Sequence, residues 1–96
     1  MSACAQLNYN NVTPAVWACL SELSGSRGGP DPLPNTGSFS AQGYTLAWSY
    51  NPPAQTAWVQ CTDSPTLVPC FAINAVLESA ISSCYASTGA SLKSFA

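Results

Sequence analysis

The 96-residue sequence contains no histidine and only six charged side chains. Without histidine, the usual acid-base partner of a serine or cysteine nucleophile is missing. The only cations are Arg27 and Lys93, whereas phosphate and anionic-lipid binding draw on clusters of basic residues. The sequence therefore argues against a nucleic-acid partner and against a polybasic membrane-surface patch. With a net charge of −2, solubility must depend on serine, threonine, asparagine and glutamine.

The four carboxylates do not form a recognisable catalytic pattern. Glu22 and Glu78 are expected on the solvent-facing sides of helices, and Asp31 falls in a loop rich in glycine and proline. Asp63 precedes a predicted helix, where a cap or an interaction with the helix dipole is the ordinary explanation. Nothing indicates a glycosidase-like pair or a glycine-rich phosphate loop. We therefore predict that the protein is not an enzyme, with no catalytic residues and no cofactor.

Long apolar runs are also missing. No stretch approaches the roughly 20 residues that a membrane-spanning helix needs, so no transmembrane segment is expected. The first ten residues, MSACAQLNYN, lack the basic start and apolar core of a signal peptide. For a secreted protein, this predicts that the signal has been removed and that Met1 was added for expression.

Cysteine, by contrast, is abundant for so short a chain, and this predicts disulfides and a secreted, extracellular protein. An odd number leaves one thiol over, which is either buried and free or linked to a second copy of the chain. A metal site is not expected, because there is no histidine, no Cys-x-x-Cys pair and no local cluster among the cysteines. They are Cys4, Cys19, Cys61, Cys70 and Cys84.

A first helix is predicted between Thr13 and Gly25. Thr13 suits the N-cap, Pro14 the first helical position and Gly25 the end. The stretch 24–37 that follows is rich in glycine and proline and predicts a long exposed loop. The apolar residues that recur at helical spacing are Val16, Cys19, Leu20 and Leu23.

Two strands and a second helix follow. Residues 44–50 and 56–62 alternate as strands do, and the breaker at 51–55 makes them a hairpin. In the second strand, Ala57 and Cys61 share one face, and Trp58 points to the other. The helix at 70–86, ended by Gly89, places these residues on its inner side: Cys70, Ile73, Val76, Leu77, Ala80, Ile81 and Cys84.

The terminal segments 2–9 and 90–96 complete the expected strands. The resulting order is strand, helix, strand, strand, helix, strand, within a single domain over residues 1–96. This predicts an α+β fold of the ferredoxin-like split β-α-β type, with two helices on one face of a four-stranded antiparallel sheet. The product is a disulfide-stapled α/β sandwich.

Geometry limits the disulfide pairings. Cys70 and Cys84 lie on one predicted helix about 21 Å apart at ~1.5 Å per residue, so they cannot bridge one another. Cys19 faces inward from the first helix and Cys61 faces inward from a strand beneath it, and we predict a bond between them. Cys4, on the first strand, is then left with Cys84 or with Cys70.

Aromatic side chains mark a predicted contact surface. Trp58 alternates away from the core face, and with Trp48 and Tyr50 on the neighbouring strand it suggests a patch that stacks on sugars or contacts a protein. The alternative is that most of these rings pack in the core or at a subunit interface. Arg27, predicted near the tip of the long loop, is a further contact candidate.

Asn11 is a candidate glycosylation site. It begins the sequon Asn11-Val12-Thr13. Pro14 follows the sequon, and Thr13 is also the predicted helix cap, and both features oppose modification.

Three segments carry a resemblance to a known family: AVWACLSEL in the first helix, TAWVQC ending a central strand, and AINAVLESAISSC in the second helix. In pattern and element order, the chain resembles the fungal killer-toxin-like effectors, which are small secreted α/β sandwiches of smut-fungus toxins and of plant-pathogenic fungi. The resemblance implies a bond between Cys19 and Cys61 and a second from Cys4 to the C-terminal half. The chain departs from the family in having two cysteines in the second helix and an odd total.

The resemblance further implies secretion by a fungus, no enzymatic chemistry, and action by binding or disturbing a target. Our first hypothesis is therefore a secreted, non-enzymatic effector or toxin-like protein that binds an unknown protein or glycan outside the producing cell. The alternative is a structural or surface-active extracellular protein that self-assembles into a homo-oligomer. With so few charges, copies of the chain repel one another only weakly. A weaker third hypothesis is an enzyme inhibitor that presents Arg27.

Overall fold

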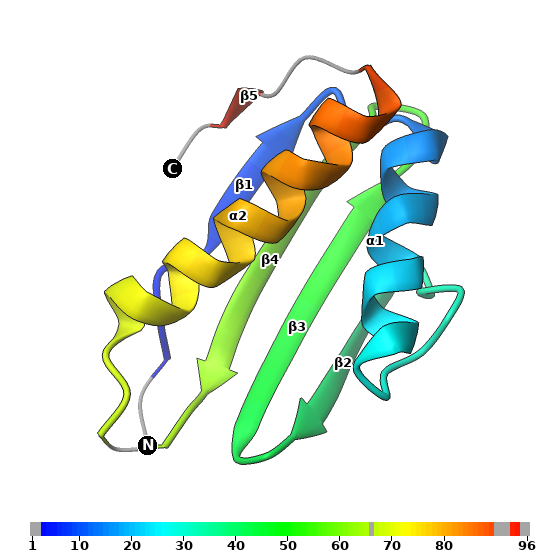
Figure 1. Ribbon diagram of the computed structural model, residues 1–96. Helices are drawn as coiled ribbons and strands as arrows, with labels where there is room; N and C mark the ends of the chain where they lie inside the picture. Colours follow the sequence, from blue (N-terminus) through cyan, green and yellow to red (C-terminus); the bar gives the residue numbers. More distant parts are fainter. Residues whose placement is uncertain (1–2, 66, 90–92, 95–96) are drawn as a thin grey trace.

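The computed structural model describes residues 3–65, 67–89 and 93–94. They form an antiparallel sheet with two helices across one face, so the predicted α+β class is confirmed (Figure 1). The strand order in the sheet is β2-β3-β4-β1-β5. The elements along the chain are β1 (Leu7–Asn10), α1 (Pro14–Ser26), β2 (Thr36–Ala41), β3 (Tyr44–Asn51), β4 (Thr56–Asp63), α2 (Cys70–Thr88) and β5 (Lys93–Ser94).

The helix boundaries follow from local chemistry. The Thr13 hydroxyl accepts the backbone N–H of Val16 at 3.3 Å, and Pro14 occupies the first position of α1 as predicted. The helix passes Gly25 and ends at Ser26. At the other helix, α2 ends at Gly89, which has the left-handed φ of 75° that favours glycine.

The sequence patterns do not predict strand β2, whose first two residues fall in the glycine- and proline-rich stretch 24–37. It pairs with β3 along its whole length, from Thr36↔Ser49 to Ala41↔Tyr44. The connecting residues Gln42 and Gly43 both have positive φ, 54° and 86°, as the tight turn of a two-residue hairpin requires. The described residues therefore contain one strand more than the predicted βαββαβ order, and the sheet that they form has five strands.

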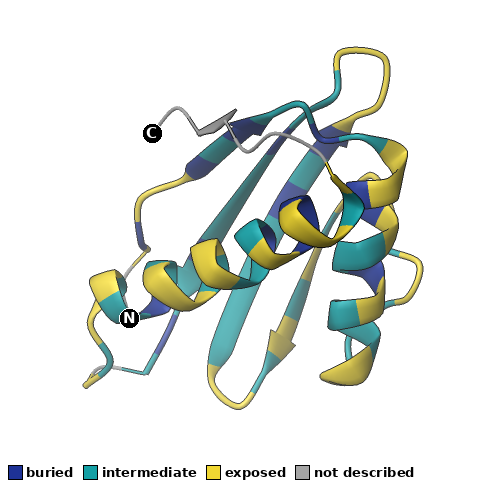
Figure 2. Ribbon diagram, turned by 45° about the horizontal axis from the view of Figure 1, so that its top comes forward, coloured by how far each residue is buried: buried dark blue, intermediate teal, exposed yellow. Residues whose placement is uncertain are grey.

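The core lies between the helices and the inner face of the sheet. Trp17 of α1 stacks on Tyr50 of β3 with ring centroids 4.5 Å apart. Figure 2 shows that the buried positions of both helices face the strands. Val76 was predicted to point inward but is 58% exposed, because Leu77 takes the position against the core. The main cluster comprises Leu7, Tyr9, Val12, Val16, Trp17, Trp48, Tyr50, Ala57, Ile81, Cys84 and Tyr85.

The two disulfides are Cys4–Cys70 and Cys19–Cys84, with Cα atoms 5.3 Å and 5.6 Å apart. The predicted Cys19–Cys61 bond is wrong. Cys19 is only partly buried on α1 and faces the other helix, whereas the Cys61 thiol is fully buried in β4 and donates to the carbonyl of Asp63 at 3.1 Å. Of the two alternatives for Cys4, bonding to Cys70 is confirmed and bonding to Cys84 is wrong. Two disulfides in so small a chain indicate an oxidising, extracellular environment.

Candidate functional site

The two helices diverge across the sheet. They lie closest where the Cys19–Cys84 bond joins them, and they separate toward the C-terminal end of α1 and the N-terminal end of α2 (Figure 1). Strands β3 and β4 run beneath the widening gap. Side chains point inward along the whole length of each strand. Where the helices separate, neither helix completely covers the apolar side chains of the strands below.

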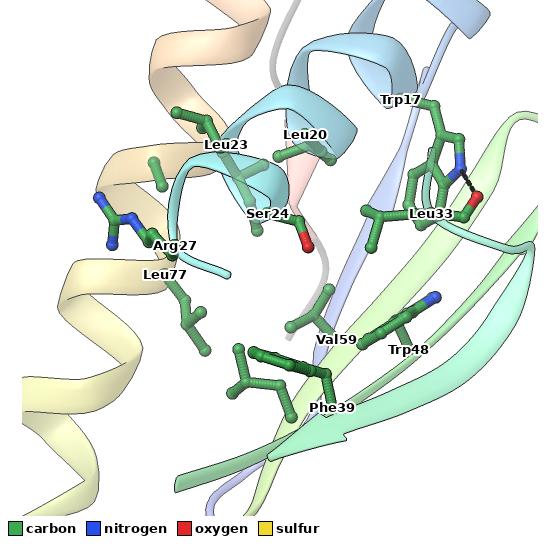
Figure 3. Close-up of a pocket in the computed structure, with 13 residues that line it drawn as sticks. Trp17, Leu20, Leu23, Ser24, Arg27, Leu33, Phe39, Trp48, Val59 and Leu77 are labelled. Atoms are coloured by element: carbon green, nitrogen blue, oxygen red, sulfur yellow. Dashed lines mark hydrogen bonds between the residues drawn. The ribbon is translucent and has the colours of Figure 1, made fainter. Parts of the chain in front are cut away.

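A cavity of about 190 Å³ occupies this position (Figure 3). Each helix contributes one wall, and the inward side chains of β2, β3 and β4 form the floor. Only two of the lining residues are polar, namely Ser24 and Arg27. The apolar lining residues are Trp17, Leu20, Leu23, Leu33, Phe39, Leu46, Trp48, Val59, Leu77, Ala80 and Ile81.

The loop between α1 and β2 accepts hydrogen bonds from the indole N–H groups of Trp17 and Trp48, which both line the cavity. Trp17 Nε1 donates to the carbonyl of Leu33 at 3.3 Å, and Trp48 Nε1 donates to the carbonyl of Pro34 at 2.8 Å. The backbone N–H of Leu33 in turn donates to the buried Ser21 hydroxyl at 3.0 Å. Both indole N–H groups are therefore satisfied within the protein, and the hydrocarbon parts of the rings remain for the cavity.

Arg27 lies at the edge of this cavity and is the only charged residue among the described residues that line it. It caps the C-terminus of α1, donating its backbone N–H to the carbonyl of Ser24 at 3.0 Å, and does not occupy the tip of a loop as predicted. Its side chain is exposed. Two further hollows border it, one against α2 and one against Phe39 and Tyr44.

The carboxylates of the described residues lie elsewhere. Glu22 and Asp31 line a separate hollow on the outer side of α1. Glu78 is close enough to Tyr9 to affect its phenol: burial, and next the charge of Glu78, raise the pKa of Tyr9 to about 12. Asp63 ends β4, where its carboxylate accepts the N–H of Ser64 at 3.0 Å, so the predicted role at the start of α2 is wrong.

The predicted aromatic patch does not form. Trp48 and Tyr50 are each only 6% exposed and lie on the inner face of the sheet, where the Tyr50 hydroxyl donates to the carbonyl of Val12 at 2.8 Å. Trp58 occupies the opposite face, as its alternation predicts, between its register partners Asn8 and Ser49. The alternative of core packing therefore holds for the first two rings, while Trp58 is half-buried among neutral polar side chains.

Arg27 is the one ionisable side chain among the described residues that line the cavity. Among the described residues, no group of three or more His, Cys, Asp or Glu side chains could hold a metal ion. The fully buried Cys61 thiol belongs to a different core cluster, with Cys4 and Ile73. Neither described helix combines the length and the apolar character needed to cross a bilayer.

Asn11 lies between β1 and α1 in a left-handed conformation, with φ of 57°, and is partly buried. The side chain of Thr13 is engaged as the cap of α1. Glycosylation of Asn11 stays a prediction.

No protein-family model matches the chain, and no curated protein or solved structure matches it. The resemblance to the killer-toxin-like effectors stays a prediction. The sequence patterns did not indicate the cavity, although one signal was available: Leu33 stands alone among prolines, and Phe39 alternates with serines.

Proposed function

We propose that this protein is a secreted, non-enzymatic effector or toxin-like protein that acts by binding a target outside the producing cell. The observation that carries the proposal is the open cavity between the helices, whose walls are apolar and whose rim bears one cation. Pockets of this composition bind ligands through desolvation, with a few polar groups fixing orientation. The Cys19–Cys84 bond joins the two helices that form the walls of the cavity, and disulfides are common in small extracellular proteins.

We further infer a ferredoxin-like split β-α-β fold extended by one edge strand. Without β2, the sheet order is β3-β4-β1-β5, in which β1 lies between the strands that flank α2. This arrangement supports the inference, since β2 then adds only a hairpin arm at one edge.

Kinship with the fungal killer-toxin-like effectors is part of the same proposal. Two helices across one face of a sheet, clamped by disulfides, support it. The Cys4–Cys70 bond agrees with the implied link from Cys4 to the C-terminal half, whereas the Cys19–Cys84 bond replaces the implied Cys19–Cys61 bond. The bond pattern therefore supports the kinship only in part.

The test is exposure of living cells to the folded, oxidised protein. Fungal competitors and plant leaf tissue would be treated, and growth inhibition or cell death would be measured. We expect an effect from the oxidised protein and none from the same protein reduced and alkylated, because its clamped surface is then lost. Equal potency of the oxidised and the reduced, alkylated samples contradicts the proposal. A protein that neither affects nor binds any cell type tested also contradicts it.

Self-assembly is a second candidate, favoured by exposed apolar side chains at the start of α2. Leu67 is 95% exposed and Phe71 is 79% exposed, and side chains of this kind favour contact with a partner. The buried thiol of Cys61 removes one argument for this candidate, since it cannot link two folded copies. Sedimentation at increasing concentration separates the candidates: growing oligomers, with or without reductant, support assembly, and a constant monomer supports the effector.

A further inference from the structure

We propose that the cavity between α1 and α2 binds a small amphiphilic carboxylate, with its hydrocarbon part inside and its carboxylate on the Arg27 guanidinium. The inference rests on the proposed binding function and names the class of ligand. Its three supports are the size of the cavity, the composition of its walls and the position of the single cation.

The size of the cavity limits the hydrocarbon part. A cavity of about 150 Å³ lined by Leu, Ile and Phe holds one benzene ring. The volume here is about 190 Å³, which corresponds to roughly six to nine carbon atoms by the same comparison. A medium-chain carboxylate such as octanoate has this size, whereas a long membrane lipid does not.

The walls favour hydrocarbon over any polar group. Leu20 and Leu23 of α1 and Leu77 of α2 line the cavity, and its two tryptophans have their N–H groups bonded to the loop carbonyls. A hydroxyl or amide placed inside would lose its water without gaining a partner. Each buried methylene, in contrast, tightens binding about fourfold.

The charge at the rim selects the head group. Arg27 is exposed at the edge of the cavity, and among the described residues no carboxylate forms an ion pair with it. Glu22 and Asp31 line the hollow outside α1, and Glu78 lies toward Tyr9. A guanidinium offers two parallel N–H donors that match a carboxylate. The ligand should therefore be an anion with its charge at one end.

The experiment is a titration of the full-length oxidised protein with octanoate, 1-octanol and octylammonium. Because Trp17 and Trp48 line the cavity, tryptophan fluorescence reports occupancy, and calorimetry gives the affinity. We expect octanoate to bind more tightly than octanol, and octylammonium to bind least. Hexanoate should bind about 15-fold more weakly than octanoate, from two lost methylenes.

Variants separate the charge from the cavity. Arg27→Gln should weaken octanoate binding about tenfold or more and leave octanol binding unchanged. Ala80→Phe, which fills the cavity from α2, should abolish binding of both. Trp58→Phe on the opposite face is the matched control and should change neither. Circular dichroism of each variant establishes that it folds.

The proposal is overturned if octanoate fails to bind or if octylammonium binds as tightly as octanoate. It is also overturned if Arg27→Gln weakens the binding of octanoate and of octanol to the same extent. A dimer that forms in the absence of ligand and dissociates in Ala80→Phe would show that a second copy fills the cavity, and it would also overturn the proposal. Loss of octanoate binding with cell activity retained refutes this inference alone. Octanoate binding without any cell activity refutes the proposed effector role alone.

Discussion

Cys19 of α1 and Cys84 of α2 are bonded to each other, so this disulfide joins one helix to the other and not a helix to the sheet. The helices separate from one end to the other (Figure 1). Their wider end carries residues that line the cavity, among them Leu23 of α1 and Leu77 of α2. The disulfide therefore joins the two helices that form the walls of the cavity.

Removing the Cys19–Cys84 disulfide should strongly lower the free energy of unfolding. The bonded residues are 65 positions apart, and closing a loop of that length in the unfolded chain corresponds to about 4 kcal/mol. We expect Cys19→Ala/Cys84→Ala to lose about that much unfolding free energy in urea. Cys4→Ala/Cys70→Ala, with a separation of 66, is the matched comparison. A loss below about 1 kcal/mol for either pair would show that the bond does not constrain the unfolded chain as this argument requires.

The thiol of Cys61 should be unreactive in the folded protein. It is fully buried and donates to the Asp63 carbonyl, so a thiol reagent cannot reach it without unfolding. We expect alkylation to be slow in buffer and complete in denaturant, with mass spectrometry locating the modified residue. Cys61→Ser, which keeps a donor for the same carbonyl, should show no alkylation in either state. Rapid modification of the native protein would contradict the burial of this residue.

Two buried tyrosines should respond oppositely to loss of the hydroxyl. The hydroxyl of Tyr9 is buried without a hydrogen-bond partner among the described residues, so Tyr9→Phe should raise the unfolding free energy by about 1 kcal/mol. The Tyr50 hydroxyl donates to the Val12 carbonyl at 2.8 Å, and Tyr50→Phe should lower it by about 1 to 2 kcal/mol. Chemical denaturation of both variants tests the contrast, which fails if the two shifts have the same sign.

Stability should fall in alkaline solution. Burial raises the pKa values of Tyr50 and Tyr85, and burial with Glu78 and Tyr85 raises that of Tyr9 to about 12. Because the unfolded pKa is near 10, the neutral phenols favour the folded state. Their contribution is complete below pH 10 and is lost as the pH rises from 10 through 12.

The measurement is the unfolding free energy against pH, together with absorbance titration of tyrosinate. Tyr9→Phe serves as the control and should reduce the decline between pH 10 and 12. A decline that begins below pH 9 in the native protein would contradict the assigned cause.

Local patterns predicted both helices and the β3–β4 hairpin, because caps, breakers and alternation are properties of neighbouring residues. Thr13 and Gly89 illustrate this, since each marks a helix end through its own backbone or side-chain chemistry. Strand β2 was missed because its turn, Gln42-Gly43, lacks the Asn-Gly or Asp-Gly signature of such hairpins.

Local sequence patterns did not predict the disulfide pairing or the cavity. Helical spacing places Cys19 and Val16 on one stripe, but it does not say which neighbour each one meets. In the folded chain, Val16 packs on the core and Cys19 meets α2 at the edge of that stripe. The cavity depends on the angle between two helices, which is set by contacts between segments far apart in the chain.

Strand β1 is synthesised well before the strand with which it pairs. Its pairing partner β4 comes late in the chain, and so does Cys70, the disulfide partner of Cys4, which precedes β1. During synthesis, the β1 segment must leave the ribosome and wait for them, so the protein cannot build its sheet in the order in which it is translated. The inner strands of the sheet therefore come together only after residues 56–63 have been made, which places the closure of the N-terminal half under the control of the C-terminal half.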